Sequence, residues 1–184
     1  MAAVLDKPAK RWTYEESWSL GPEKRCEIID GELFMPPSPD TWHQEWSFDL
    51  SMLVGAHVKR HKLGRFFVAP LDVVLDPENT VQPDLIFVAN SNLGIIQRRA
   101  IFGAPDLLIE LISPSTVRRD RYDKKEIYAR FGVKEYWIGD PANKSLEILV
   151  LKAGRYELHC SAEEKGKLVS SVLAGFEFDL SEIQ

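Results

Sequence analysis

The sequence is poor in cysteine, in long apolar runs and in positive charge, and each shortage excludes a class of protein. Only two cysteines, Cys26 and Cys160, occur in 184 residues, too few for a disulfide-stapled secreted scaffold, so we expect a reduced, cytoplasmic protein. No apolar run approaches the roughly 20 residues that span a bilayer, so no membrane partner is expected. The N-terminus lacks the basic and apolar regions of a signal peptide, and we expect none.

The acidic balance and the missing catalytic signatures narrow the function further. A formal net charge of −5 argues against a protein that coats nucleic acid, because such a surface needs a surplus of Lys and Arg. It does not exclude a nuclease, whose active-site carboxylates add negative charge and for which a local basic patch suffices. The chain contains no Gly-x-Ser-x-Gly elbow, no Cys-x-x-Cys pair and no Walker loop, so hydrolases that depend on these motifs are not expected.

Two acidic residues stand in stretches that otherwise have the composition of buried strands. Residues 81–88 and 105–113 are short, apolar and partly β-branched, which is typical of strands buried on both faces. A buried carboxylate costs on the order of several kcal/mol unless it is paired, hydrogen-bonded or bound to a metal. Glu110 within the second stretch and Asp84 near the head of the first are therefore candidate functional residues.

Short-range sequence signals predict the secondary structure of the N-terminal half. Thr13 and Glu16 have the spacing of a capping box that starts a short helix. Asp30-Gly31 between apolar residues predicts a hairpin that pairs Ile29 with Glu32 and places Glu27 opposite Phe34. The subsequent elements are a long amphipathic helix from about 41 to 62 closed by Gly64, a strand pair over 65–69 and 71–75, and a strand over 81–88.

The C-terminal half predicts one helix and several strands. Residues 90–103 have no clear periodicity and form a predicted loop with a helical turn near the substrate. A helix is expected from about 120 to 131, closed by Gly132, and a buried strand over 135–140. Three alternating segments then predict a C-terminal antiparallel meander: 144–152, 155–160 and 167–172. Residues 1–10 are expected to be a flexible tail, and 11–184 a single domain.

Four motifs in order resemble one known family. They are Glu27-Ile-Ile-Asp-Gly-Glu, Val81-Gln-Pro-Asp-Leu, Pro105-Asp-Leu-Leu-Ile-Glu-Leu-Ile-Ser-Pro-Ser-Thr and Gly132-Val-Lys-Glu-Tyr-Trp-Ile-Gly-Asp-Pro. Together they resemble the Uma-two family of endonucleases in the restriction-endonuclease-like, PD-(D/E)XK superfamily. The resemblance implies an α/β (α+β) fold with a central mixed β-sheet flanked by helices, an N-terminal hairpin and the C-terminal meander. It also implies DNA as substrate; the subunit number stays open, with a homodimer as one alternative.

The chemistry of such a nuclease requires a divalent ion. Mg²⁺ or Mn²⁺ neutralises charge on the phosphoryl oxygens and activates water, and Mg²⁺ needs only one or two protein carboxylates. Asp84 and Glu110 on neighbouring strands would supply them. Along its strand Glu110 shares a face with Asp106, Leu108 and Ile112, while the opposite face is wholly apolar. We therefore expect the site to open on one side of the sheet.

The superfamily's usual Glu-x-Lys pattern is broken here, because Ile112 stands where the lysine would be. Asp120, Lys124 and Tyr128 recur at a spacing of four, which places them on one helix face. We favour Lys124 as the catalytic cation that has migrated to this helix, as the family resemblance also implies. Lys125 is the competing candidate, and a simple surface ion pair between Asp120 and Lys124 is the structural alternative.

Other candidate residues have two interpretations each. Glu27 points either to solvent or to the site, and the resemblance favours a catalytic position. His43 is a surface or capping residue by its place in a helix, but the resemblance makes it a supporting residue of the site. Asp120 and Tyr128 are supporting candidates because they share a helix face with Lys124. His57 and His61 have the spacing of a metal pair, yet neighbouring Lys and Arg residues favour a basic helix terminus instead.

Two function classes follow. One is a Mg²⁺- or Mn²⁺-dependent endodeoxyribonuclease that uses Glu27, Asp84, Glu110 and Lys124. The other is a noncatalytic protein of nuclease fold that binds nucleic acid or protein. The intact set of four ionisable residues favours the enzyme, because a decayed site has no reason to keep them all.

Overall fold

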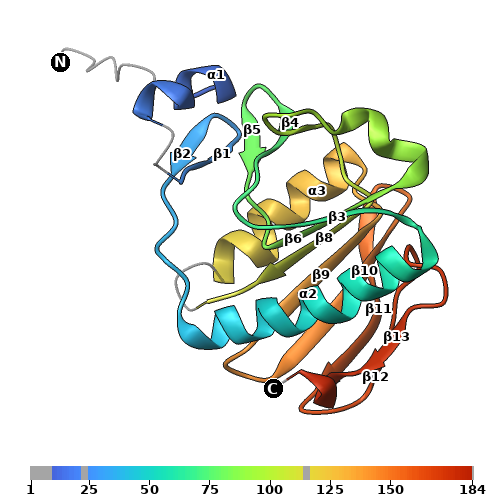
Figure 1. Cartoon of the computed structure of the whole chain (residues 1–184). Coiled ribbons are helices and arrows are strands. Elements are labelled where there is room, and N and C mark those ends of the chain that lie inside the picture. The colour runs from blue at the N-terminus through green and yellow to red at the C-terminus, as the bar shows by residue number, and fades with distance from the viewer. Residues whose placement is uncertain (1–9, 22–24, 114–116, 184) are drawn as a thin grey trace.

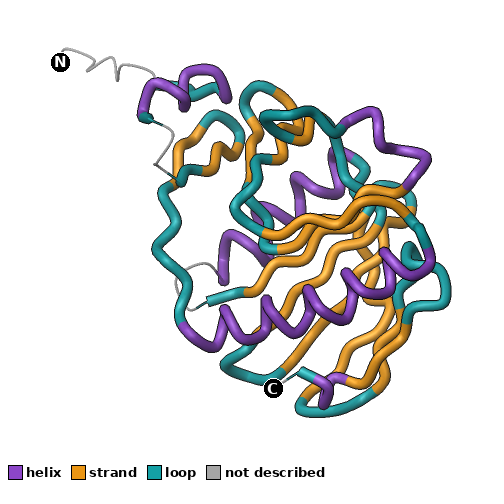
Figure 2. Tube along the Cα trace, in the orientation of Figure 1, coloured by secondary structure: helices purple, strands orange, loops and turns teal. Residues whose placement is uncertain are grey.

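The structure, a computed structural model, describes residues 10–21, 25–113 and 117–183 (Figure 1). The predicted flexible tail, residues 1–10, lies outside this part of the chain except for Lys10. Six of the strands form a central layer, and a long helix crosses one face of it (Figure 2). This mixed sheet flanked by helices is the predicted fold class.

The main sheet has six strands in the order β11-β10-β9-β8-β6-β3. Its strands are β3 (Gly64–Val68), β6 (Leu85–Ala89), β8 (Leu107–Leu111), β9 (Glu135–Asp140), β10 (Ser145–Lys152) and β11 (Arg155–Glu163). β8 and β9 run parallel and the other neighbours antiparallel, so the sheet is mixed. The central strands β6, β8 and β9 are buried almost throughout, as a sheet covered on both faces requires.

Helix α2 (Thr41–His61) covers one face of this sheet (Figure 1). Asp40 caps its first turn with a side-chain hydrogen bond. Its buried stripe consists of Trp46, Leu50, Val54 and Val58. These side chains share a hydrophobic core with Leu107, Ile109 and Leu111, so the face of β8 opposite Glu110 is wholly apolar, as predicted.

The end of α2 differs from the prediction. Lys62, not Gly64, adopts the left-handed conformation that closes the helix, with φ 53°. Gly64 instead begins β3, where a Cβ would lie 2.0 Å from the carbonyl oxygen of Val88. Close approach of two strands therefore explains the glycine. Trp42, in the first turn of the helix, lies outside the buried stripe and is 60% exposed.

A second sheet has the order β2-β1-β5-β4-β7. Its strands are β1 (Glu27–Ile29), β2 (Glu32–Phe34), β4 (Val73–Asp76), β5 (Asn79–Val81) and β7 (Ile101–Phe102). β1 and β2 form the predicted hairpin, with Ile29 opposite Glu32 and Glu27 opposite Phe34. The two-residue turn thus fixed the register that the sequence indicated.

The N-terminal helical segment packs on this second sheet. It consists of α1 (Tyr14–Ser17) and the 3-10 helix η1 (Trp18–Leu20). Thr13 and Glu16 form the predicted capping box. The backbone N–H of Tyr14 donates to the carbonyl of Pro77 in the β4–β5 turn, which attaches α1 to the sheet.

The predicted pairing of residues 65–69 with 71–75 is wrong. β3 pairs with β6 in the main sheet, whereas β4 pairs with β5 and β7 in the second sheet. Both segments have strand composition, but composition does not specify the neighbour of a strand.

The single strand predicted over 81–88 is also wrong. β5 ends at Val81 and β6 begins at Leu85, in different sheets. Pro83 explains the break, because it has no N–H for a strand ladder and restricts the residue before it. The break carries the chain from one sheet to the other and puts Asp84 directly before β6.

The predicted C-terminal meander is only half present. β10 and β11 pair antiparallel as expected. β12 (Lys167–Val169) pairs instead with β13 (Glu177–Asp179), a strand the sequence analysis missed, in a separate two-stranded sheet. The segment after β12 leaves the predicted strand 167–172 because the buried carboxylate of Glu135 accepts hydrogen bonds from Ser170, Ser171 and Val172.

The predicted helix over 120–131 forms with a widened first part. It begins as a π-helix, η3 (Arg119–Lys124), and continues as α3 (Lys125–Phe131), which Gly132 closes with φ 83°. Tyr128 of α3 shares a core with Leu108 of the main sheet. Helix α3 therefore covers the face of the sheet that α2 leaves free, on which Glu110 stands.

The remaining elements are short. Residues 90–103, predicted as a loop with a helical turn, contain the 3-10 helix η2 (Asn90–Ile95) and the strand β7. A last 3-10 helix is η4 (Leu180–Glu182). None of the helices in the described ranges has the length and apolar character needed to cross a membrane.

Candidate active site

Side chains from both sheets and from η3 converge on the ammonium group of Lys124. Its Nζ lies 2.8 Å from Glu27 Oε1, 2.9 Å from Glu110 Oε1 and 3.3 Å from Asp120 Oδ1. All four residues are buried. An ammonium group has three N–H donors and no acceptor, so three carboxylates match its donor count. The lysine that lies among these carboxylates is thus Lys124 and not Lys125.

Hydrogen bonds from the described residues reach only one of the two carboxylate oxygens of Glu110. Its Oε1 accepts a hydrogen bond from Lys124 and a second, 2.6 Å long, from the hydroxyl of Tyr128. Within the described residues, its Oε2 accepts no hydrogen bond from the protein. Asp120, Lys124 and Tyr128 therefore lie on one helix face, as predicted, and this face is turned toward Glu110.

Glu27 reaches the site from β1, at the start of the hairpin. Its Oε1 accepts a hydrogen bond of 3.0 Å from the backbone N–H of Gln82, in addition to the contact with Lys124. Its exposed fraction is 2%. The interpretation in which Glu27 points to solvent is therefore wrong.

Asp84 is fixed by its neighbours on β8 and α2. Its Oδ2 accepts a hydrogen bond of 2.8 Å from the backbone N–H of Leu111 and lies 3.2 Å from His43 Nε2. Burial by itself lowers the pKa of His43, but the hydrogen bond and charge of Asp84, with the charge of Asp40, outweigh it and raise the pKa. His43 thus supports Asp84, as predicted for a residue near the site.

Burial and the neighbouring opposite charges act against each other on the pKa values of Glu110 and Lys124. Burial raises the pKa of Glu110 well above the usual value, even though Lys124 opposes this shift. Burial also lowers the pKa of Lys124, but Glu110, Glu27 and Asp120 together hold that pKa well above the usual value. Lys124 is therefore a cation at neutral pH, and the carboxylates around it outnumber it.

These groups line an open cleft of about 590 Å³ between α2, the loop before it and the ends of β6 and β8. Five carboxylates and two cationic side chains line it, a formal charge of −3 with His43 neutral: Glu27, Asp40, Asp84, Glu110 and Asp120 against Arg25 and Lys124. Such a cleft repels a phosphodiester unless a further cation is bound.

The donor set of the cleft fits a hard divalent cation. Asp84 Oδ1, like Glu110 Oε2, accepts no hydrogen bond from the described residues, which leaves one oxygen of each carboxylate for a cation. Mg²⁺ needs only one or two carboxylates and keeps several waters. Among the described residues, no group of three or more His, Cys, Asp and Glu side chains has the arrangement of a metal site made by the protein alone.

Comparison with known proteins shows which family the chain belongs to. The model of one family, described as "Putative restriction endonuclease", matches residues 12–181. The chain belongs to the Uma2 family. The family resemblance drawn from the four sequence motifs is thereby confirmed.

A solved structure supports the fold of this Uma2 chain. The chain is similar to the crystal structure of a putative nuclease belonging to DUF820 from Anabaena variabilis, with a TM-score of 0.76 and 19% sequence identity. The match covers 93% of this chain and 96% of that one. It confirms the predicted restriction-endonuclease-like fold. No curated protein matches the chain.

All the predicted site residues come together in this Uma2 structure. Six line the cleft, namely Glu27, His43, Asp84, Glu110, Asp120 and Lys124, and Tyr128 contacts Glu110. His57 and His61 do not line it; His57 instead contacts the carbonyl of Ala174.

The lining residues that the sequence did not predict as part of the site include Gln82 and Arg25. Gln82 had a signal, because it is polar in a stretch of strand composition, and its backbone N–H holds Glu27. Arg25 had none, since it stands outside any periodic pattern.

Asp106, directly before β8, and Glu110, within it, are expected to respond oppositely to neutralisation. The pKa of Asp106 is lowered, because Lys134, the backbone N–H of Ala89 and Asn92 outweigh the effect of burial. Asp106→Asn should therefore lower the free energy of unfolding at pH 7 by about 1–3 kcal/mol. Glu110→Gln should leave the metal-free protein as stable as the parent or more stable, because it relieves a buried charge in an acidic cluster.

Urea unfolding at several pH values checks both signs. The contribution of Asp106, with its lowered pKa, is present above the unfolded pKa of about 3.9 and is lost as the pH falls through its folded pKa. For Glu110, whose pKa is raised, protonation favours the fold, so any advantage of Glu110→Gln at pH 7 should shrink as the pH falls toward about 4.3. A large loss of stability in Glu110→Gln at pH 7 would make Glu110 a structural partner of Lys124 instead.

Proposed function

We propose that this protein is a metal-dependent endonuclease that hydrolyses phosphodiester bonds in DNA. The observation that carries the proposal is the convergence of Lys124 with Glu27, Glu110 and Asp120, beside Asp84, in one open cleft. The description of the Uma2 family supports it, as does the similarity to the crystal structure of a putative nuclease.

In the proposed mechanism the metal ligands, Glu27 and Lys124 have separate roles. Asp84 and Glu110 would hold Mg²⁺ or Mn²⁺, which neutralises charge on the phosphoryl oxygens and lowers the pKa of bound water. Glu27 has one oxygen that no described residue contacts, so it is placed to accept a hydrogen bond from the attacking water. Lys124 supplies a fixed positive charge where negative charge grows in the transition state.

The supporting residues keep these groups in place. Tyr128 fixes the Oε1 of Glu110, and His43 with the backbone of Leu111 fixes the Oδ2 of Asp84. Asp120 contacts Lys124 one helical turn away. Preorganised groups of this kind lower the cost of reorganisation during the reaction.

The lysine position of the superfamily cannot serve here. Ile112 occupies it, and its side chain lies in the apolar core under α3. A charged side chain at that position would be buried among apolar groups. Lys124 on η3 reaches Glu110 from the neighbouring helix and replaces it.

Isothermal calorimetry with Mn²⁺ and Mg²⁺ tests the metal site. We expect weak binding to the parent protein and loss of most of that binding in Asp84→Asn and in Glu110→Gln, because each change removes one of two charged ligands. Asp106→Asn is the matched control, since Asp106 lies directly before the same strand but pairs with Lys134. Unchanged metal binding in both ligand variants would place the metal elsewhere.

One observation favours the noncatalytic alternative. Lys124 is 4% exposed, and its three N–H donors match three protein carboxylates, so the cluster is also a self-sufficient buried ion network. A protein of this kind would bind nucleic acid or protein without cleaving it. Binding of DNA in Ca²⁺ with no cleavage in Mg²⁺ or Mn²⁺ would support this alternative.

A further inference from the structure

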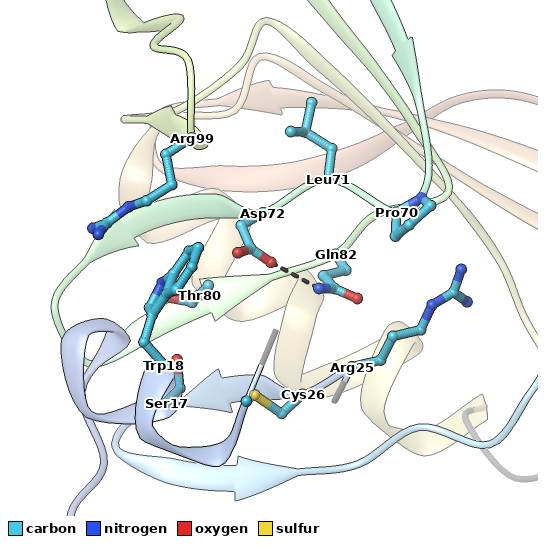
Figure 3. Close-up of a pocket in the computed structure, with 11 residues that line it drawn as sticks. Ser17, Trp18, Arg25, Cys26, Pro70, Leu71, Asp72, Thr80, Gln82 and Arg99 are labelled. Atoms are coloured by element: carbon cyan, nitrogen blue, oxygen red, sulfur yellow. Dashed lines mark hydrogen bonds between the residues drawn. The ribbon is translucent and has the colours of Figure 1, made fainter. Parts of the chain in front are cut away.

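A second pocket of about 330 Å³ adjoins the proposed catalytic cleft and shares Arg25 and Gln82 with it. Figure 3 shows Trp18 and Arg99 on one side of Asp72, and Arg25 on the other, with Gln82 next to Asp72. The backbone N–H of Gln82 belongs to the catalytic cluster, while its side chain lines the second pocket. Gln82 therefore lies between the cleft and the second pocket and contributes to both.

One wall of this pocket is a fixed aromatic ring. Trp18 of η1 is 43% exposed although it is held on two sides. The ring of Tyr14 meets it edge-on at 6.2 Å, and the guanidinium group of Arg99 lies 4.9 Å from its ring centroid. Arg99 is in turn paired with Glu15 at 2.5 Å. A rigid, partly exposed indole is the kind of surface on which an unpaired base stacks.

The neighbouring wall carries unused hydrogen-bonding groups. Gln82 Nε2 donates to Asp72 Oδ1 at 2.7 Å, which orients both side chains and leaves Gln82 Oε1 and Asp72 Oδ2 as acceptors.

We propose that this pocket accepts an unpaired base of the DNA strand that lies in the cleft, next to the phosphate to be cleaved. The inference rests on the proposed nuclease function for the identity of the strand. Trp18 stacks on the base, and Asp72 and Gln82 bind its polar edge. Arg25, exposed on the rim shared by both sites, contacts the intervening phosphate.

The chemistry of the polar wall favours guanine. A carboxylate and an amide oxygen accept hydrogen bonds, and guanine presents two adjacent donors, N1–H and the N2 amino group, on its pairing edge. Thymine presents one donor between two carbonyl oxygens. These oxygens would lie opposite the acceptor oxygens of Asp72 and Gln82, which do not bind them. We therefore expect guanine to bind more tightly than thymine at this position.

The test is an abasic scan of a fluorescein-labelled, non-self-complementary single-stranded DNA of twelve nucleotides, bound in Ca²⁺. An abasic site at one position should weaken binding to the parent about tenfold, as loss of one stacked base does, and guanine there should bind more tightly than thymine. Trp18→Ala should weaken binding of the intact strand equally and abolish the abasic effect. Trp42→Ala is the control, because Trp42 is 60% exposed and lines neither pocket.

A second variant distinguishes loss of strand binding from loss of folding. Asp72→Asn keeps the shape of the side chain and an oxygen that can accept the hydrogen bond from Gln82 Nε2, so it should unfold near the urea concentration of the parent. It places an amide donor against the two donors of guanine, so it should weaken binding of the strand that carries guanine several-fold.

The inference is overturned if the parent binds no strand, if every abasic strand binds like the intact one, if thymine binds as well as guanine, or if Trp18→Ala behaves like Trp42→Ala. Plasmid cleavage by the same preparations separates this result from the proposed function. Cleavage with no abasic effect removes only the base pocket, and an abasic effect without cleavage supports the pocket while hydrolysis fails.

Discussion

Lys124→Ala is expected to lower the single-turnover rate of DNA cleavage by roughly 10²-fold or more, while equilibrium binding in Ca²⁺ changes far less. The reason is that Lys124 acts on charge that grows only in the transition state. Lys125→Ala changes the net charge equally at the next residue along the chain, but Lys125 does not line the cleft. It should cleave near the parent rate, with slightly weaker, salt-dependent binding.

Burial of Lys124 adds a stability effect that the experiment must separate. Its removal leaves Glu27, Glu110 and Asp120 without their shared counter-charge, which costs about 3–5 kcal/mol for a broken buried pair. Mg²⁺ should therefore raise the melting temperature of Lys124→Ala more than that of the parent. Lys124→Arg keeps the charge and should stay folded, yet its planar group does not reproduce the ammonium contacts, so its cleavage rate should also fall.

Equal cleavage rates for the parent and a folded Lys124 variant would contradict the assignment. The same rate loss in Lys125→Ala would reduce the role of both residues to general electrostatic attraction of DNA. Only a loss confined to Lys124 supports the migrated lysine.

Glu135→Ala is expected to lower the free energy of unfolding by about 3–5 kcal/mol without any role in catalysis. Glu135 is fully buried on β9. Its carboxylate accepts hydrogen bonds from five donors: Trp137 Nε1, Ser170 Oγ, Ser171 N, Ser171 Oγ and Val172 N. The alanine variant leaves these donors without their acceptor and releases the segment after β12 from the main sheet.

Urea unfolding of Glu135→Ala measures the loss, with Glu157→Ala as the control. Glu157 forms an exposed ion pair of 3.0 Å with Lys152, and exposed pairs contribute about 0–1 kcal/mol. The two variants remove the same side chain, so they differ mainly in burial and hydrogen bonding. Similar stability of both would show that the contacts of Glu135 are replaced by water at little cost.

The sequence predicted those parts of the structure that short-range physics determines. The capping box at Thr13 and the register of the hairpin at Asp30 follow from a few neighbouring residues. The face of Lys124 follows from helical periodicity, even though η3 is a π-helix. Glu110 was found because a carboxylate in an apolar strand is costly and needs a partner.

Long-range pairing could not be read in the same way. Alternation predicts a strand but not its neighbour, so β3 was paired with β4 and β12 was added to β11. The apolar residues on both sides of Pro83 concealed the change of sheet that places Asp84. The pocket at Trp18 was also missed, because an exposed indole on a short helix has no distinctive pattern before Thr80 and Asp72 are seen beside it.

The most direct test of the account is a cleavage assay on supercoiled, linear and single-stranded DNA with Mg²⁺ or Mn²⁺, with the parent and Asp84→Asn side by side. We expect the parent to cleave at least one substrate only when the metal is present, and Asp84→Asn, which loses a metal ligand of the cleft, to cleave none at a comparable rate. No cleavage of any substrate by the folded parent with either metal, or cleavage by Asp84→Asn at the parent rate, would contradict the proposed active site.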